Sequence, residues 1–244
     1  MMAWSADRRF AKIIDYHSRG RETLWGYACP SSPIDGLWEQ TAAELSQASG
    51  YGGAERPPSA DGEHYQWQFG AYSSMAFLTE THDQFQPDHS SAQAEAATVW
   101  PGTLWLLERE MPATGRVTDS CSGAPLDATY EVTSLPFTQG ERGVAGGPFG
   151  RYHAFLPPGT HTLRFEAPGH SPRSVQVNVP AAGGATVDVA LDPIGAGGTV
   201  YCATLPNSTG LPATLTVVGS SSIAVNQFAL AAEVLPSFQP ALFT

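Results

Sequence analysis

The chain has 244 residues, of which 42% are hydrophobic, and its 23 acidic and 12 basic side chains give a formal charge of −11. This acidity makes nucleic acid and anionic membrane surfaces poor partners. No run approaches the roughly 18 apolar residues of a spanning helix, so we expect neither a membrane span nor a leader segment. The composition predicts a globular protein of two or three small domains.

The N-terminal part, residues 1–111, predicts an α/β domain with a mixed sheet, and it holds all six tryptophans and the only lysine. Apolar runs predict buried strands over 11–16 and 74–79. Apolar residues at helical spacing predict a helix over 33–49, and the turn-rich stretch 50–62 predicts a loop.

A closing helix is predicted over residues 91–110, where apolar residues recur every three to four positions. Ser90 or Ser91 is the expected N-cap. Pro101 is expected to kink the helix or to split it, because proline cannot donate the backbone hydrogen bond of that position.

Residues 115–192 change to short β-branched runs separated by glycine and proline turns, which predicts an all-β sandwich. The predicted strands are 115–118, 128–133, 151–155, 159–167, 174–179 and 185–191. A glycine-rich joint at 195–198 precedes a β-rich tail over 199–244 that stops in mid-pattern and is expected to be incomplete. The three cysteines, which are too scattered for a zinc cluster or a disulfide framework, are Cys29, Cys121 and Cys202.

Two predicted strands are each followed by a side chain that can take part in metal binding or acid–base catalysis. His17 follows the strand 11–16, and Glu80 follows the strand 74–79. A histidine and a carboxylate at the ends of neighbouring strands are suited to a metal ligand and a general base of a hydrolytic site.

The segment from Asp15 to Gly20, followed by Leu24-Trp25-Gly26-Tyr27, resembles the M14 zinc carboxypeptidases. The strand ending in Glu80 and the helix 91–110 resemble further parts of the same family. The resemblance implies that His17 is a Zn²⁺ ligand, that Glu80 is the general base, and that peptide or protein C-termini are the substrates. Substrate preference stays open, although Tyr65-Gln66-Trp67 falls near the side-chain pocket of the family.

The resemblance covers only the C-terminal half of that family's domain, roughly residues 8–111. None of the seven histidines is followed three positions later by an acidic residue, so the His-x-x-Glu that supplies the other two ligands is absent. Residues 1–111 also contain no asparagine for gripping a substrate. The chain alone is therefore expected to be inactive, with the remaining ligands coming from sequence upstream of Met1, and its sheet is expected to expose an edge or an apolar face.

Residues 115–192 resemble a carboxypeptidase regulatory-like, transthyretin-type β-sandwich, through Gly115-Arg116-Val117-Thr118-Asp119 and Leu156-Pro157-Pro158-Gly159. Such a module commonly follows an M14 domain, and the attached β modules imply a secreted or periplasmic protein. The alternative is a non-catalytic secreted binding or scaffold protein with β-sandwich modules.

The remaining histidines are expected to be structural. His64 is assigned to a polar loop and His89 to a helix-capping region. His82 and Asp83 directly follow Glu80 and could be recruited to the site, but they are assigned to a solvated loop edge. The three that are predicted to lie on the sandwich surface are His153, His161 and His170. A nucleophilic triad of Ser18, His17 and Asp15 is excluded, because neighbours along a strand alternate faces.

Overall fold

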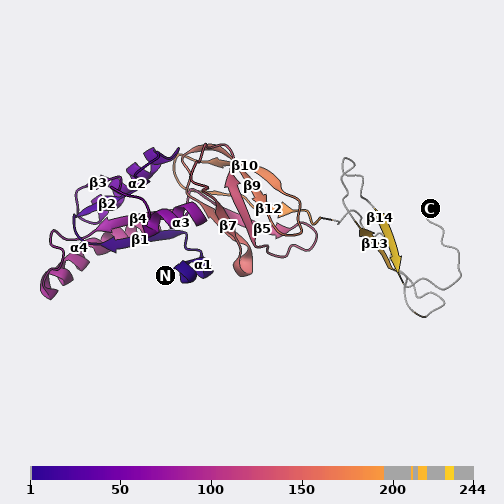
Figure 1. The fold of residues 1–244 in the computed structure, drawn as a ribbon, viewed down its shortest axis with the longest axis horizontal. Helices are drawn as coiled ribbons and strands as arrows, with labels where there is room; N and C mark the ends of the chain where they lie inside the picture. The colour runs from indigo at the N-terminus through magenta and orange to yellow at the C-terminus, as the bar shows by residue number, and fades with distance from the viewer. Residues whose placement is uncertain (1, 195–209, 211–213, 219–228, 234–244) are drawn as a thin grey trace.

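The computed structural model describes residues 2–194, 210, 214–218 and 229–233. An N-terminal α/β part and a β-sandwich lie side by side (Figure 1). The elements of the α/β part are α1 (Met2–Arg8), β1 (Lys12–His17), β2 (Glu22–Leu24), α2 (Asp35–Ala48), β3 (Glu55–Arg56), α3 (His64–Tyr72), β4 (Met75–Glu80) and α4 (His89–Glu108).

The sheet of the α/β part is mixed, with strand order β1-β4-β2-β3. Strands β1 and β4 are parallel, while β2 runs antiparallel to β4. Strand β1 has no partner on its outer side among the described residues, so the sheet exposes an edge there, as expected. The core beneath the sheet is built around large buried side chains, including Trp38, Phe69 and Phe77.

Helices α3 and α4 lie on opposite faces of β1. Asp15 lies near His64 of α3, whereas the hydroxyl of its neighbour Tyr16 forms a hydrogen bond of 2.7 Å with the hydroxyl of Thr103 in α4. Because successive residues of a strand point to opposite faces, the two helices must cover different sides of the strand.

Helix α4 differs from its prediction at its start and at its proline. Its N-cap is Asp88, whose carboxylate accepts hydrogen bonds from the backbone N–H groups of Ser90 and Ser91 at 3.0 and 3.1 Å. The helix continues through Pro101 without being split. Buried residues on both sides of the proline, including Glu95 and Leu106, anchor the helix and offset the missing hydrogen bond.

Two helices were not predicted. Helix α1 precedes the first strand, and α3 begins at His64, which was assigned to a loop. Glu63 and Gln66 form a reciprocal capping box at the start of α3. Glutamate in place of the usual serine or threonine made this signal inconspicuous in the sequence.

The sandwich contains β5 (Ala113–Asp119), β6 (Ala128–Val132), β7 (Gly143–Ala145), the 3-10 turn η1 (Gly147–Phe149), β8 (Arg151–Ala154), β9 (Gly159–Glu166), β10 (Arg173–Val179), β11 (Ala185–Thr186) and β12 (Val189–Leu191). One sheet has the order β10-β9-β6-β7, and the other has β11-β5-β12 with β8 also paired to β5. Strand β7 was missed, and the predicted strand 185–191 is divided at Val187, whose carbonyl accepts a hydrogen bond from the hydroxyl of Tyr152 at 2.7 Å.

The three histidines of the sandwich are not surface residues, contrary to the prediction. His153 and His161 are buried, and the side chain of His170 is only 11% exposed beside Asp119. His161 shares the inward face of β9 with Leu163 and Phe165, because these positions alternate by two.

The two parts share apolar contacts. Phe155 of the sandwich belongs to the core of the α/β part, where its ring meets Phe77 edge-on at 6.3 Å. The backbone N–H of Phe155 also donates to the carbonyl of Ser73 at 3.2 Å. The relative placement of the two parts therefore rests on core packing.

Cys29 and Cys121 are exposed and free, whereas Cys202 lies outside the described residues. Most of the predicted tail 199–244 also lies outside them, apart from the antiparallel pair β13 (Thr214–Val218) and β14 (Ala229–Glu233). Within the described part of the chain, no helix has the length and apolarity needed to cross a membrane.

Candidate functional site

His17 and Glu80 are the last residues of β1 and β4, and they are register partners across the parallel ladder. Partnered residues of neighbouring strands project from the same face of a sheet. The two side chains therefore project from the same face of the sheet, at the ends of adjacent strands.

Asp15 and His64 extend this group. The carboxylate of Asp15 lies 3.5 Å from Nε2 of His17 and 3.7 Å from Nδ1 of His64. Asp15 meets His17 because residues two apart on a strand share a face. His64 was not placed near the site from the sequence. It was assigned to a loop, and a loop residue cannot be positioned against a strand from sequence alone.

Ser18 does not join this group. Its hydroxyl donates to the carbonyl of Phe85 at 3.1 Å. Asp15, His17 and Ser18 therefore form no chain of hydrogen bonds, which agrees with the exclusion of a nucleophilic triad.

Glu80 is held in surroundings that favour its protonated form. Its Oε2 atom is buried and has no hydrogen-bond partner among the described residues. Burial raises the pKa of Glu80 above the ordinary carboxyl value, the charge of His17 acts in the opposite direction, and nearby Glu22 raises it further. Glu22 is itself paired with Arg56 at 2.9 Å, and the charge of Arg56 acts to lower the pKa of Glu80.

A buried carboxylate, Glu95 of α4, connects the segments that follow the site strands. Arg21 donates to it at 2.8 and 3.1 Å, the hydroxyl of Tyr51 donates at 2.7 Å, and the backbone N–H of His82 donates at 2.9 Å. These donors lower the pKa of Glu95 to about 2, with the Arg21 hydrogen bond as the largest cause. Glu95 thus fixes the positions of the loops beside His17 and Glu80.

His82 corrects a further prediction. Its side chain is buried and not solvated, and its φ of 61° is held by the bond from its backbone N–H to Glu95. Nδ1 of His82 accepts a hydrogen bond from the backbone N–H of Gln84 at 2.8 Å. Its neighbour Asp83 is exposed.

Within the described residues, no three His, Cys, Asp or Glu side chains are grouped closely enough to hold a metal ion. Catalytic zinc sites use three protein ligands. His17 can supply one of them, and the unpartnered oxygen of Glu80 is suited to accept a proton beside it. The described residues thus fit part of a zinc site and its base.

A sequence model of the carboxypeptidase regulatory-like domain matches residues 113–192. These residues form a carboxypeptidase regulatory-like domain. Its range overlaps the predicted module 115–192, and its structure is the β-sandwich described above. The same comparison shows no M14 peptidase domain in residues 1–111. No curated protein matches the chain.

Proposed function

We propose that residues 1–111 are the C-terminal part of a zinc metallocarboxypeptidase of M14 type, which releases C-terminal residues from peptides. The observation that carries this proposal is the register pairing of His17 with Glu80 at the ends of adjacent parallel strands. The regulatory-like domain that packs against this part supports it, because that domain is named for its association with carboxypeptidases. The attached β-sandwich module also supports a secreted or periplasmic location.

In this proposal the side chains of His17 and Glu80 have different tasks. The imidazole of His17 would hold a Zn²⁺ ion, which when bound lowers the pKa of water to about 7 and polarises a carbonyl group. Oε2 of Glu80 would accept a proton from the attacking water and donate it to the leaving amine. Its raised pKa brings the carboxyl closer to the range in which both transfers are feasible.

We further propose that the other ligands come from a segment that docks along β1. This strand is the edge of its sheet, and exposed backbone groups at a sheet edge can pair with an added strand. Large apolar side chains are exposed on the neighbouring helix α4, where Trp100 is 58% and Leu107 is 68% exposed. An apolar surface of this kind is expected where another segment packs.

The second candidate is a non-catalytic binding or scaffold protein. It is favoured by the finding that the described residues supply no group of three metal ligands. The two functions differ in what they require of Zn²⁺, so metal affinity distinguishes them.

The test is isothermal titration of the 244-residue chain, and of any longer product of the same reading frame, with Zn²⁺. Each is also assayed for cleavage of a blocked dipeptide. For a product that carries the missing ligands, the enzyme proposal expects tight zinc binding that is lost in His17→Ala, together with turnover. If every product binds zinc weakly and is inactive, the enzyme proposal fails and the binding function replaces it.

The variant Glu80→Gln separates the proposed base from the ligand. We expect it to remove most turnover and to leave zinc affinity unchanged, since Glu80 is not a ligand in this proposal. In a longer product that carries the other ligands and an unmodified Glu80, turnover should decline as the pH falls through the raised pKa of Glu80, because only the ionised carboxylate accepts a proton. A pH profile measured with saturating zinc checks this expectation, and unchanged turnover in the variant would contradict it.

A further inference from the structure

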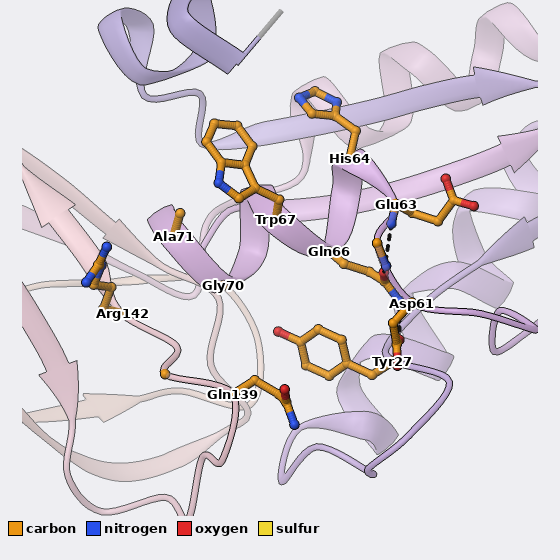
Figure 2. Close-up of a pocket in the computed structure, with 12 residues that line it drawn as sticks. Tyr27, Asp61, Glu63, His64, Gln66, Trp67, Gly70, Ala71, Gln139 and Arg142 are labelled. Carbon is orange, nitrogen blue, oxygen red and sulfur yellow. Dashed lines mark hydrogen bonds between the residues drawn. The ribbon is translucent and has the colours of Figure 1, made fainter.

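A groove of about 700 Å³ runs over the outer face of α3, between the α/β part and the sandwich (Figure 2). Along the helix it is lined by Glu63, His64, Trp67, Gly70 and Ala71, whose spacing of three to four residues places them on one face. Tyr27 forms one wall, and Gln139 with Arg142 of the sandwich forms another. Its size suits a ligand as large as a short peptide.

The groove begins beside the candidate site. His64 lines the groove and also lies 3.7 Å from Asp15, which in turn lies 3.5 Å from His17. Arg142 lies farther along the groove, next to Gly70 and Ala71 (Figure 2). A chain extending from the site edge along α3 would therefore reach Arg142.

Arg142 carries a positive charge that is available to a ligand. Its backbone N–H donates to the carbonyl of Gly70 at 2.9 Å, but among the described residues its guanidinium group has no hydrogen bond or ion pair. Arg19, Arg116, Arg151 and Arg173 also lack an ion pair among the described residues, but none of them lines the groove. The arginines that are paired with carboxylates of other segments are Arg9, Arg21, Arg56 and Arg109.

The acidic residues of the groove are occupied by local contacts. The carboxylate of Asp61 accepts from the backbone N–H of Ala28 and from the side-chain amide of Gln66, both at 2.8 Å. The side chain of Glu63 accepts from the backbone in the capping box of α3. Asp61 and Glu63 lie at the opposite end of the groove from Arg142 (Figure 2), and neither forms an ion pair with it among the described residues.

We propose that this groove binds an extended peptide and that Arg142, contributed by the regulatory-like domain, selects a peptide with an acidic side chain. The choice of a peptide ligand rests on the proposed carboxypeptidase function. An arginine guanidinium group forms strong, charge-assisted hydrogen bonds with carboxylates. The faces of Trp67 and Tyr27, together with the amide of Gln139, offer apolar and polar contacts for the rest of the peptide.

Gly70 allows the groove itself to be tested. A Cβ atom at this position would lie 3.5 Å from the hydroxyl of Tyr27, which is an ordinary contact, so Gly70→Ala should be accommodated. The larger side chain of Gly70→Leu would occupy the groove. Both replacements favour helix formation over glycine, so neither should unfold α3.

The experiment measures fluorescence anisotropy of a fluorescein-labelled, alanine-based hexapeptide with one glutamate, and of its counterpart with glutamine, without added zinc. We expect the glutamate peptide to bind more tightly, and Arg142→Gln to weaken its binding by about tenfold while leaving the glutamine peptide unaffected. Gly70→Leu should weaken both peptides, and Gly70→Ala neither. Arg151→Gln, which removes an exposed charge outside the groove, is the matched control and should have no effect.

The proposal is overturned if neither peptide binds, if both bind equally, or if Arg142→Gln or Gly70→Leu leaves binding unchanged. Because the assay uses neither zinc nor turnover, its result is independent of the metal site. If the chain fails to bind zinc but binds the peptide through Arg142, the groove proposal is retained and the enzyme proposal is rejected. Zinc-dependent turnover in a chain whose peptide binding does not depend on Arg142 would retain the enzyme proposal and reject the groove proposal.

Discussion

Glu95 shows how a single buried carboxylate can organise three separate segments. Its bonds to Arg21, Tyr51 and the backbone of His82 join residues that are 74, 44 and 13 positions away in the chain. The charge is well satisfied, so removing it leaves these donors without their partner. Glu95 thus holds the loops beside the candidate site in place without taking part in the proposed chemistry.

We expect Glu95→Gln to lower the free energy of unfolding by about 2 kcal/mol at pH 7. The folded-state pKa of Glu95 is about 2, below the ordinary value of 4.5, so the stabilisation is present above pH 4.5 and is lost as the pH falls toward 2. Urea unfolding at several pH values measures the difference between the variant and the unmodified chain. Glu108→Gln, at an exposed position of the same helix, is the control, and an equal effect there would contradict this role of Glu95.

His153 is a buried histidine of the sandwich. Folding favours the neutral form of its ring, whereas it favours the charged form of Glu95. Burial lowers its pKa from 6.5 to about 4, because the charged ring is poorly solvated. The folded state therefore loses stability as the pH falls from 6.5 to 4, where the unfolded chain takes up the proton first. NMR titration of the ring should show it neutral at pH 5.5, and a midpoint near 6.5 would contradict its burial.

At the scale of elements, α4 and the end of α2 meet at a glycine. A Cβ atom at Gly102 would lie 1.9 Å from Oγ of Ser49 and 3.1 Å from its Cα. This close approach depends on the missing side chain, although glycine is a poor helix former. Gly102 therefore follows Pro101 in a helix that packing holds together in spite of both residues.

We expect Gly102→Ala to destabilise the protein by about 1–3 kcal/mol, because the backbone near Ser49 must move. Alanine is otherwise the better helix former, so intrinsic propensity alone would give the opposite sign. Gly36→Ala in α2 is the matched control, since a Cβ atom there has no neighbour within 4 Å, and it should be neutral or slightly stabilising. Thermal unfolding of both variants decides between packing and propensity.

At the scale of the molecule, the two parts form one packed unit. Phe155 of the regulatory-like domain is fully buried in the core of the α/β part, and Phe137 packs against Phe69 at 6.0 Å. Buried aromatic contacts of this kind couple the stability of both sides. The sandwich thus supplies part of the core that supports β4 and the end of that strand at Glu80.

We expect the α/β part and the sandwich to unfold in one transition. All six tryptophans lie in residues 1–111, so their fluorescence reports on the α/β part, while circular dichroism includes the strands of the sandwich. The two signals should coincide in urea, and Phe155→Ala should lower the free energy of unfolding by about 3–5 kcal/mol. Separate transitions in the unmodified chain would show that the interface does not couple the parts.

Local patterns were sufficient to predict much of this architecture. The apolar runs before His17 and Glu80 became β1 and β4, and the two-residue alternation over 174–179 became β10 with Val177 and Val179 buried. These features could be read from the sequence because strand periodicity and turn chemistry depend on residues close together in the chain. The sandwich was predicted from the same kinds of signal, supported by its family resemblance.

Only the tertiary structure decided what lies around those strand ends. The register between β1 and β4, the approach of His64 to Asp15 and the bonds around Glu95 all join residues far apart in the sequence. Burial of His82 and His153 likewise depends on which elements pack over them. The sequence by itself determined the strands and the residues at their ends, whereas packing between distant segments determined their neighbours, their solvation and hence their charge states.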